Sequence, residues 1–333
     1  MKTPSLKLND VVAAHRRLAG GVQRTPVQES PTLSRAGGAR VWLKREDLQR
    51  TGSFKERGAR NALLSLTPKQ RACGVVAASA GNHASGLAFH GVALGVHVTV
   101  VMPINASPVK IARCRGLGAQ VVLRGENFDI AERFARVFAA ERGATYVHPF
   151  DDLRVIAGQG TVALELLEQV PNVDTVVVPV GGGGLLAGVA TAVKALQPGV
   201  RVVAVEPQNA AGFLAACLRG SPEKTATQPT LADGLAVACV GENAFALAAP
   251  RIDDVVTVTE DEIATAIRHL AQDHGIVAEG AGATAVAAWL SGKVGRATQV
   301  VLPITGRNID ARLHRELTRR TTVATTCRLP RAA

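Results

Sequence analysis

The chain of 333 residues is 47% hydrophobic and 20% charged, which is enough for two domains or two lobes of one enzyme. No apolar run approaches the roughly 20 residues of a membrane span, and the N-terminus lacks a signal-peptide core, so we expect a cytoplasmic protein without membrane contact. The net charge of +11 would suit a protein that binds nucleic acid. However, the arginines are scattered with few aromatic residues among them, and the densest group, from Arg312 to Arg331, is typical of a solvated tail. Five widely spaced cysteines form no Cys-x-x-Cys pair, which argues against a zinc site or disulfides.

Strand-like and helix-like segments alternate along most of the chain. Short runs rich in Val, Ala and Leu predict buried strands at 41–44, 74–79, 96–102, 119–123, 145–147, 173–180, 201–206, 255–258 and 299–303. The segments between them predict helices at 8–19, 58–66, 84–91, 109–117, 128–142, 156–169, 185–196, 210–219, 261–274, 279–290 and 313–318. Strands this apolar, separated by helices, predict an α/β fold of parallel strands covered by helices on both faces.

Lys55 stands out because it follows a Thr-Gly-Ser turn and Phe54, at the start of a helix-like run. We predict Ser53 as the N-cap of that helix, which places Lys55 in its first turn. The positive end of a helix dipole lowers the pKa of an amine there, and a lysine that loses its proton easily suits Schiff-base chemistry. Most lysines are solvated surface charges, so this interpretation depends on partners elsewhere in the chain.

Two turns that follow predicted strands carry side chains suited to a ligand. The first, Ser79-Ala80-Gly81-Asn82-His83, offers small residues, free backbone amides and one Asn side chain, which together suit a carboxylate. The alternative for this turn is an ordinary connection capped by Ser79. In the second turn, Thr305 presents a neutral hydroxyl to a ring nitrogen or serves only as a capping threonine.

A run of four glycines, 181–184, separates a predicted strand from a predicted helix. Glycines let backbone amides approach an anion, and the helix N-terminus adds favourable potential, so the run predicts a phosphate site. No Gly-Lys-Ser/Thr follows, which excludes a P-loop. The pattern Gly182-x-Gly184-x-x-Ala187, with Glu206 ending the next strand, also matches the dinucleotide fingerprint of an NAD-dependent dehydrogenase.

Taken in order, these motifs resemble those of the threonine/serine dehydratases. These are pyridoxal-phosphate enzymes of the tryptophan-synthase-β fold type (fold type II), to which serine racemase is also related. The resemblance extends from about residue 25 to 310 and includes the motifs at 44–49, 51–55, 79–83, 157–161 and 181–184. The dehydrogenase interpretation accounts for the glycine run alone.

The resemblance implies an α/β architecture of two open, mainly parallel sheets with helices on both faces. The cofactor would lie in the cleft between a large domain, 1–50 with 148–333, and a small domain, 51–147. We expect no C-terminal regulatory domain after residue 310, and a homodimer or homotetramer.

The resemblance also implies the roles of the site residues. Lys55 would hold pyridoxal phosphate as a Schiff base with Phe54 packed beside it, Asn82 would bond the ring hydroxyl, and Thr305 would face the pyridine nitrogen. The residues implied to bind the phosphate are Gly181, Gly182, Gly183, Gly184 and Leu185. The residues implied to hold the substrate carboxylate are Ser79, Ala80, Gly81, Asn82 and His83.

The implied activity is α,β-elimination from L-threonine, and from L-serine, to give a 2-oxo acid and ammonia. The amine of Lys55 would remove the α-proton. A hydroxyl at the pyridine nitrogen makes the ring a weaker electron sink than a carboxylate would, which favours elimination. The alternative within the same family is a lyase acting on another β-hydroxy amino acid, such as 3-hydroxyaspartate, or a dehydratase of hydroxyectoine breakdown.

Three positions depart from the family pattern. Ala80 replaces the serine that racemase relatives use as a base, so we expect elimination with little racemisation. Glu206 is followed by Gly212 where some relatives have a second acidic cation ligand, so a metal site is doubtful and we expect none. Arg307 replaces a second glycine after Gly306, and we expect its side chain to point outward.

Overall fold

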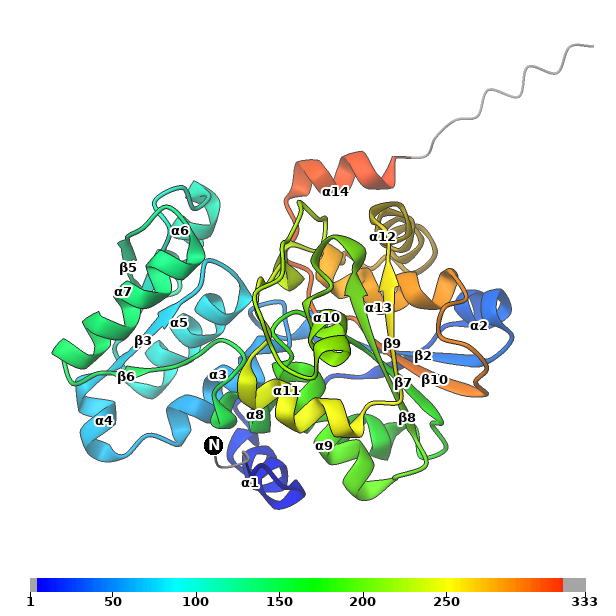
Figure 1. Ribbon diagram of the computed structural model, residues 1–333, viewed down its shortest axis with the longest axis horizontal. Helices are drawn as coiled ribbons and strands as arrows, with labels where there is room; N and C mark the ends of the chain where they lie inside the picture. Colours follow the sequence, from blue (N-terminus) through cyan, green and yellow to red (C-terminus); the bar gives the residue numbers. More distant parts are fainter. Residues whose placement is uncertain (1–4, 320–333) are drawn as a thin grey trace, which may run out of the picture.

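The computed structural model describes residues 5–319, and its strands form two separate sheets (Figure 1). The larger sheet has six strands in the order β1-β2-β10-β7-β8-β9, and the smaller has four in the order β5-β4-β3-β6. All neighbouring strands run parallel except the pair β1 and β2. The strands are β1 Val27–Glu29, β2 Arg40–Lys44, β3 Val75–Ala78, β4 Val98–Met102, β5 Gln120–Leu123, β6 Thr145–Tyr146, β7 Thr175–Pro179, β8 Arg201–Pro207, β9 Asp254–Val258 and β10 Gln299–Pro303. The predicted class, α/β with two open and mainly parallel sheets, is confirmed.

Helices connect most of the strands, as Figure 1 shows. The α-helices are α1 Leu8–Leu18, α2 Pro31–Gly37, α3 Lys55–Leu64, α4 Pro68–Cys73, α5 Asn82–Leu94, α6 Pro108–Gly116, α7 Phe128–Glu141, α8 Leu153–Gln169, α9 Gly184–Leu196, α10 Gly212–Arg219, α11 Glu242–Ala248, α12 Glu260–His274, α13 Gly280–Leu290 and α14 Ala311–Thr318. Short 3-10 turns are η1 Glu46–Leu48, η2 Gln208–Ala210, η3 Asp233–Leu235 and η4 Ala249–Arg251. Among the described helices, none is long and apolar enough to cross a membrane. The C-terminal arginine group continues past residue 319, and its last members lie outside the described residues.

Three short helices, α2, α4 and α11, were absent from the sequence-based prediction. Both α2 and α4 begin with a proline at their first position, preceded by the capping side chains of Ser30 and Thr67. The helix predicted at 58–66 ends directly before Thr67-Pro68, a pair that is typical of a helix end. A proline lacks only an amide that the first turn leaves unpaired, so the same pair also starts a helix.

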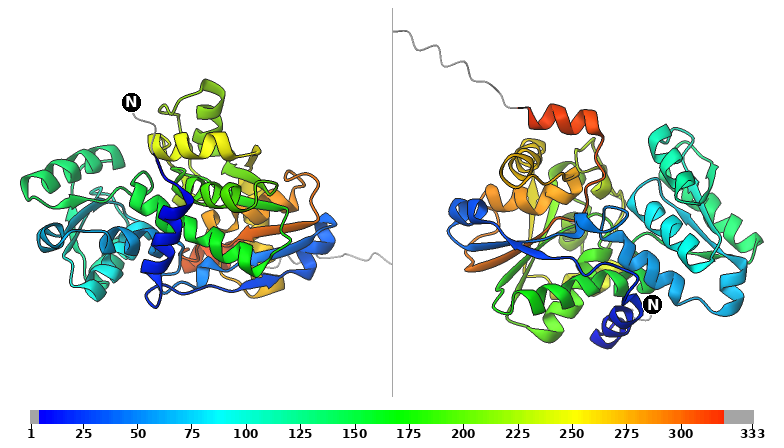
Figure 2. Two further views of the ribbon diagram at one scale, coloured as in Figure 1. Left: turned by 90° about the horizontal axis from the view of Figure 1, so that it is seen from below. Right: turned by 180° about the vertical axis from the view of Figure 1, so that it is seen from behind.

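The six-stranded sheet is buried on both faces. Along β7, Val176 and Val178 pack into one hydrophobic cluster with α8 and α9, while Val177 packs into a second cluster with α12 and α13. Successive side chains of a strand point to opposite faces, so an unbroken apolar run is what a doubly covered strand requires. The two further views show these helix pairs on opposite sides of the sheet (Figure 2).

Helix α8 lies in backbone contact with α3 on one side and with α9 on the other. A Cβ at Gly158 of α8 would lie 2.6 Å from the carbonyl oxygen of Arg57 in α3. A Cβ at Gly188 of α9 would lie 2.4 Å from the carbonyl oxygen of Ile156 in α8. Glycine is therefore required at both crossings. The same α3 also packs against α5, where a Cβ at Gly86 would lie 3.2 Å from the Cβ of Ala59.

The four-stranded sheet takes its strands from a single stretch of the chain, from Val75 to Tyr146. The six-stranded sheet combines strands from both sides of that stretch, and Figure 1 shows the two sheets in separate lobes. The predicted domain limits, 1–50 with 148–333 and 51–147, stay a prediction.

Candidate active site

The predicted ligand turns follow the carboxyl ends of parallel strands, which is where open α/β sheets bind ligands. Residues 79–81 follow β3, residues 181–183 follow β7, and residues 304–306 follow β10. Asn82 and Gly184 then begin helices α5 and α9. The strand-to-helix connections therefore present backbone amides at the edge where the predicted site residues lie.

Direct contacts join the lysine turn to the connection after β10 and to Pro149. The amide of Phe54 donates to the carbonyl oxygen of Thr305 at 3.1 Å. The Nζ of Lys55 donates to the carbonyl oxygen of Pro149 at 2.8 Å and lies 5.3 Å from the centroid of the Phe54 ring. The next residue, Phe150, packs on the glycine run. Segments far apart in the sequence thus meet around one amine.

Ser53 does not cap α3, contrary to the sequence-based prediction. The helix begins at Lys55 with Phe54 as its N-cap, and no side chain caps it. Ser53 forms an isolated antiparallel bridge with Gly306 instead. This backbone pairing holds residue 53 in place, and its buried hydroxyl has no hydrogen-bond partner in the described part of the chain.

The amine of Lys55 has a lowered pKa, as predicted. Burial disfavours the charged ammonium and lowers the pKa to about 8, while the nearby carboxylate of Glu279 opposes this shift. Burial is therefore the principal cause, rather than the helix dipole invoked from the sequence. Compared with an ordinary lysine, much more of this amine is unprotonated near neutral pH, and that is the form that reacts with carbonyl carbons.

Glu279 is a site residue that the sequence-based prediction missed. Its Oε1 accepts from Asn82 Nδ2 at 2.7 Å, and its Oε2 accepts from the amide of Asn308 at 3.1 Å. Burial raises the pKa of this carboxyl to about 7, with the charge of Asp233 adding to the shift. The only sequence signal was one carboxylate placed directly before an Ala- and Gly-rich buried helix.

Asn82 is held on both ends of its amide. Besides donating to Glu279, it accepts from Asn308 Nδ2 at 2.6 Å, and the same nitrogen of Asn308 donates to the carbonyl oxygen of Thr51 at 2.9 Å. The hydroxyl of Thr305 donates to the carbonyl oxygen of Ala281 at 3.2 Å. The roles implied for Asn82 and Thr305 toward a cofactor ring stay predictions.

The turn after β3 exposes a set of unpaired amides. In the described residues, the amides of Ala80, Asn82 and His83 donate to no protein acceptor, whereas Gly81 donates to the hydroxyl of Ser79 at 3.2 Å. Burial, and then the positive charge of Lys55, lower the pKa of His83 to about 3, so its imidazole is neutral. Such a group of amides at a helix N-terminus suits a carboxylate.

The glycine run is shaped by Phe150. A Cβ at Gly182 would lie 2.2 Å from the Cγ of the Phe150 ring, and a Cβ at Gly184 would lie 2.4 Å from the carbonyl oxygen of Phe150. Gly183 has φ of 89°, a conformation that L side chains rarely adopt. Across the part of the chain that the structure describes, the amides of 181–185 donate to no protein acceptor. These free amides at the start of α9 match the needs of a phosphate group.

Glu206 and Arg307 lie outside this arrangement. The carboxylate of Glu206 is fully buried and accepts from the amides of Phe213 and Leu214 at 2.7 and 2.8 Å. It thus binds the N-terminal turn of α10 instead of being presented to a nucleotide ribose, as the dehydrogenase interpretation required. The side chain of Arg307 is exposed, as expected from the sequence.

Comparison with known proteins decides between the two interpretations of the glycine run. A family model described as pyridoxal-phosphate dependent enzyme matches residues 18–306 of this chain. The chain belongs to the pyridoxal-phosphate-dependent enzymes. Their cofactor is pyridoxal phosphate, and the NAD-dependent dehydrogenase interpretation is therefore wrong.

Individual members of this family are similar along almost the whole chain. An L-threonine ammonia-lyase of Thermotoga maritima is 46% identical over 308 residues, covering 92% of this chain and 77% of that protein. Threonine deaminase isoform 2 of Solanum lycopersicum, in its processed form, has a TM-score of 0.87 with 37% identity, covering 93% and 86%. Maize serine racemase has a TM-score of 0.90 with 32% identity, covering 93% and 96%.

Proposed function

We propose that this protein is an L-threonine ammonia-lyase that also accepts L-serine and releases a 2-oxo acid and ammonia by α,β-elimination. The observation that supports this proposal best is the environment of Lys55. Its amine has a pKa of about 8, lies next to the Phe54 ring and donates to Pro149, while the amide of Phe54 pairs with Thr305 after β10. The relative of Thermotoga maritima, named for this activity, supports the choice of substrate.

The residues of the site fit pyridoxal phosphate. The free amides of 181–185 would hold its phosphate, and the amine of Lys55 would hold its carbonyl carbon. The buried hydroxyl of Ser53, which lacks a partner among the described residues, lies two positions from that amine. When bound, the cofactor supplies an electron-withdrawing ring that acidifies the α-hydrogen of an amino acid.

Lys55 is suited to move the α-proton of the substrate. With this lowered pKa the amine is basic enough to accept a proton and is more easily unprotonated near neutral pH than an ordinary lysine. The carbonyl oxygen of Pro149 accepts from Nζ and fixes the direction in which the amine points. The negative charge of Glu279 favours the ammonium that forms when Lys55 takes the proton.

The substrate carboxylate would bind the amides of Ala80, Asn82 and His83. A neutral His83 leaves the positive potential of these amides, and of the start of α5, as the main attraction. The methyl group of Ala80 has no proton to exchange. Proton transfer from Lys55 alone, on one face of the substrate, favours elimination over racemisation.

The proposal also covers the oligomeric state, the location and the alternative substrates of the protein. We expect a homodimer or homotetramer in the cytoplasm whose binding partner is a small amino acid. The alternative substrates are 3-hydroxyaspartate and other β-hydroxy amino acids, for which the exposed Arg307 is the residue that could add a charge contact.

Absorption spectroscopy and a substrate screen test the proposal. The purified protein should absorb visible light as pyridoxal-phosphate enzymes do, and Lys55→Ala should abolish this band. Threonine, serine and 3-hydroxyaspartate should then be compared for release of a 2-oxo acid, with threonine expected to react fastest. A protein without the band, or one active only on 3-hydroxyaspartate, would contradict the proposed function.

A further inference from the structure

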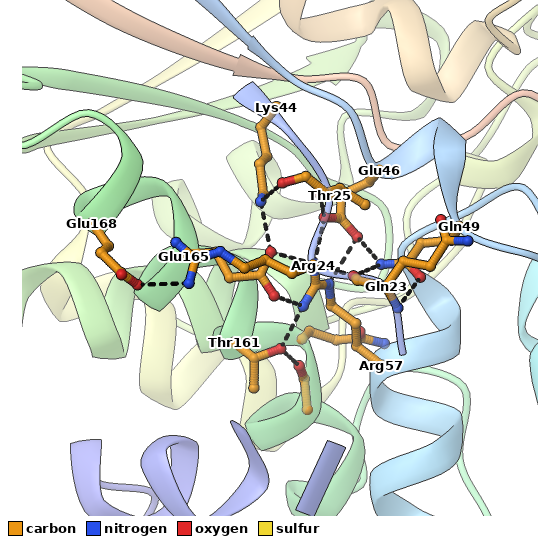
Figure 3. Close-up of polar contacts among 12 residues, drawn as sticks. Gln23, Arg24, Thr25, Lys44, Glu46, Gln49, Arg57, Thr161, Glu165 and Glu168 are labelled. Carbon is orange, nitrogen blue, oxygen red and sulfur yellow. Dashed lines mark hydrogen bonds and ion pairs between the residues drawn. The ribbon is translucent and has the colours of Figure 1, made fainter. Parts of the chain in front are cut away.

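A buried cluster of four charged side chains lies next to the start of α3 (Figure 3). Its members are Lys44 of β2, Glu46 of η1, Arg57 of α3 and Glu165 of α8, and each is at most 3% exposed. Two cations meet two anions, so the cluster is neutral as a whole. None of the roles assigned so far uses these residues.

Every donor of the Arg57 guanidinium has an acceptor. Nε and Nη2 donate to the two oxygens of Glu46 at 2.8 and 2.7 Å. Nη1 and Nη2 donate to the two oxygens of Glu165 at 2.6 and 2.8 Å, and Nη1 also reaches the hydroxyl of Thr161 at 3.2 Å. Figure 3 shows the guanidinium between the two carboxylates. Two bidentate pairs fix both the position and the plane of this group.

The carboxylates are equally well satisfied. Glu46 also accepts from the hydroxyl of Thr25 at 2.6 Å, and Glu165 also accepts from Lys44 Nζ at 2.6 Å. Burial acts to raise the pKa of Glu46, but the charge and hydrogen bonds of Arg57, together with Lys44 and Thr25, outweigh it and hold the pKa at about 2. Replacing a buried ionic cluster by apolar groups is often neutral or stabilising, so stability alone is a poor reason for this arrangement.

The cluster also lies close to Lys55 along helix α3. Arg57 lies two residues after Lys55, and the next amide, that of Gly58, donates to Gln159 Oε1 of α8 at 3.1 Å. The side chain of Lys55 has four flexible torsions, and within the described residues it makes a single hydrogen bond, to Pro149. The place of its amine therefore depends on where its backbone is held.

The cluster connects that backbone to the lobe with the glycine run. Glu46 and Glu165 both belong to segments packed with the six-stranded sheet, and α8 lies in backbone contact with α9, whose first residue is Gly184. Contacts between α3 and α5 tie the same helix to the four-stranded sheet. The first set links the backbone that carries Lys55 to the glycine run through α8 and α9.

We infer that Arg57 is a positioning residue for Lys55, because its paired bonds to Glu46 and Glu165 fix the amine-bearing end of α3 relative to the glycine run. The inference rests on the proposed function, in which those two elements hold the same cofactor. It assigns Arg57 no contact with substrate or cofactor. Displacements near 1 Å at such a position cost roughly 100-fold in reactivity.

Covalent capture of pyridoxal phosphate tests the inference without an activity assay. The full-length chain is stripped of cofactor, titrated with pyridoxal phosphate and reduced with borohydride, and the adduct at Lys55 is measured by peptide mass spectrometry. Arg57→Lys keeps the charge but loses the paired geometry, and we expect its half-saturating concentration to rise about tenfold or more. The control is Lys44→Met, which removes a cation from the same cluster but leaves every bond of Arg57 in place.

The outcomes separate positioning from stability and from the proposed function. We expect Lys44→Met to capture pyridoxal phosphate within about threefold of wild type, even though loss of a buried charge lowers its melting temperature. Equal capture by folded Arg57→Lys and wild type would overturn the inference, and so would equal losses in both variants. If Arg57→Lys does not fold, Glu165→Gln takes its place with the same expectation. A wild-type chain without adduct at Lys55 would refute the proposed function itself.

Discussion

The buried carboxylate of Glu206 predicts a pH-dependent stability that a single substitution removes. Burial raises its pKa from 4.5 to about 7, and the amide donors Phe213 and Leu214 only partly offset this effect. A carboxyl whose pKa is raised in the folded state contributes stability at low pH and loses it as the pH rises through the folded value. The window therefore runs from about pH 4.5 to about pH 7.

The magnitude follows from the size of this shift. One pKa unit corresponds to about 1.4 kcal/mol, so Glu206 should lose about 2.5 kcal/mol of its contribution to the free energy of unfolding between about pH 5 and about pH 8. Glutamine has nearly the same shape and does not titrate. Subtracting the unfolding free energy of Glu206→Gln from that of wild type removes the contributions of other groups, including Glu279, which titrates in the same window.

Urea unfolding followed by circular dichroism at the two pH values measures this difference. We expect wild type to lose stability relative to Glu206→Gln as the pH rises. Glu262→Gln is the control, because hydrogen bonds and charge lower the pKa of Glu262, so that its contribution is lost as the pH falls. A difference between wild type and Glu206→Gln that does not change with pH would refute the reasoning.

Three further predictions concern the site itself. Ala80→Ser supplies a hydroxyl that can exchange a proton, so conversion of L-serine to its enantiomer should rise above the wild-type background, as measured by chiral chromatography. Gly182→Ala places a methyl carbon 2.2 Å from the Phe150 ring, and we expect a loss of about 1–3 kcal/mol in urea unfolding, with weaker cofactor retention. Glu279→Gln removes the negative charge that raises the pKa of Lys55, so the pH midpoint for acylation of this amine in cofactor-free protein should fall, as measured by mass spectrometry.

Each of these predictions has a result that contradicts it. Unchanged racemisation in folded Ala80→Ser would count against one-sided proton transfer. For Gly182→Ala the control is Gly116→Ala, where an added Cβ meets nothing within 4 Å, and equal stability of the two variants would contradict the steric argument. A rise in the acylation midpoint of Glu279→Gln would contradict the assigned direction of the charge effect.

The regular parts of the fold were predictable because their signals are local. Apolar runs such as that of β7 are long enough to identify buried strands. The helix predicted at 261–274 forms as α12, where the hydroxyl of Thr259 accepts from the amide of Glu262 and caps the first turn. Ser53 failed as a cap because its backbone pairs with Gly306, a residue far along the chain. Helix propensity is read from neighbouring residues, so it cannot predict a bridge between residues as far apart in sequence as Ser53 and Gly306.

The site was predictable only where family motifs cover it. Lys55, Asn82 and the glycine run belong to short recognisable segments, and the structure brings these segments into one region. The sequence carries no local signal for Glu279 or Arg57, because a carboxylate or guanidinium becomes unusual only when it is buried with particular partners. Those partners are distant in sequence, 197 residues away in the bond between Asn82 and Glu279.

The close crossings of α8 with α3 and with α9 limit where segments can be exchanged between related enzymes to make a chimera. A chimera that exchanges residues 51–147 would take α3 from one parent and α8 from the other, so the backbone fit at Gly158 would combine surfaces that never evolved together. A chimera that exchanges only residues 74–147, starting just before β3, keeps all three helices with one parent and leaves the packing of α3 on α5 to be rematched. The segment suited to exchange is thus the four-stranded sheet with the helices between its strands, while Lys55 stays with the rest of the chain.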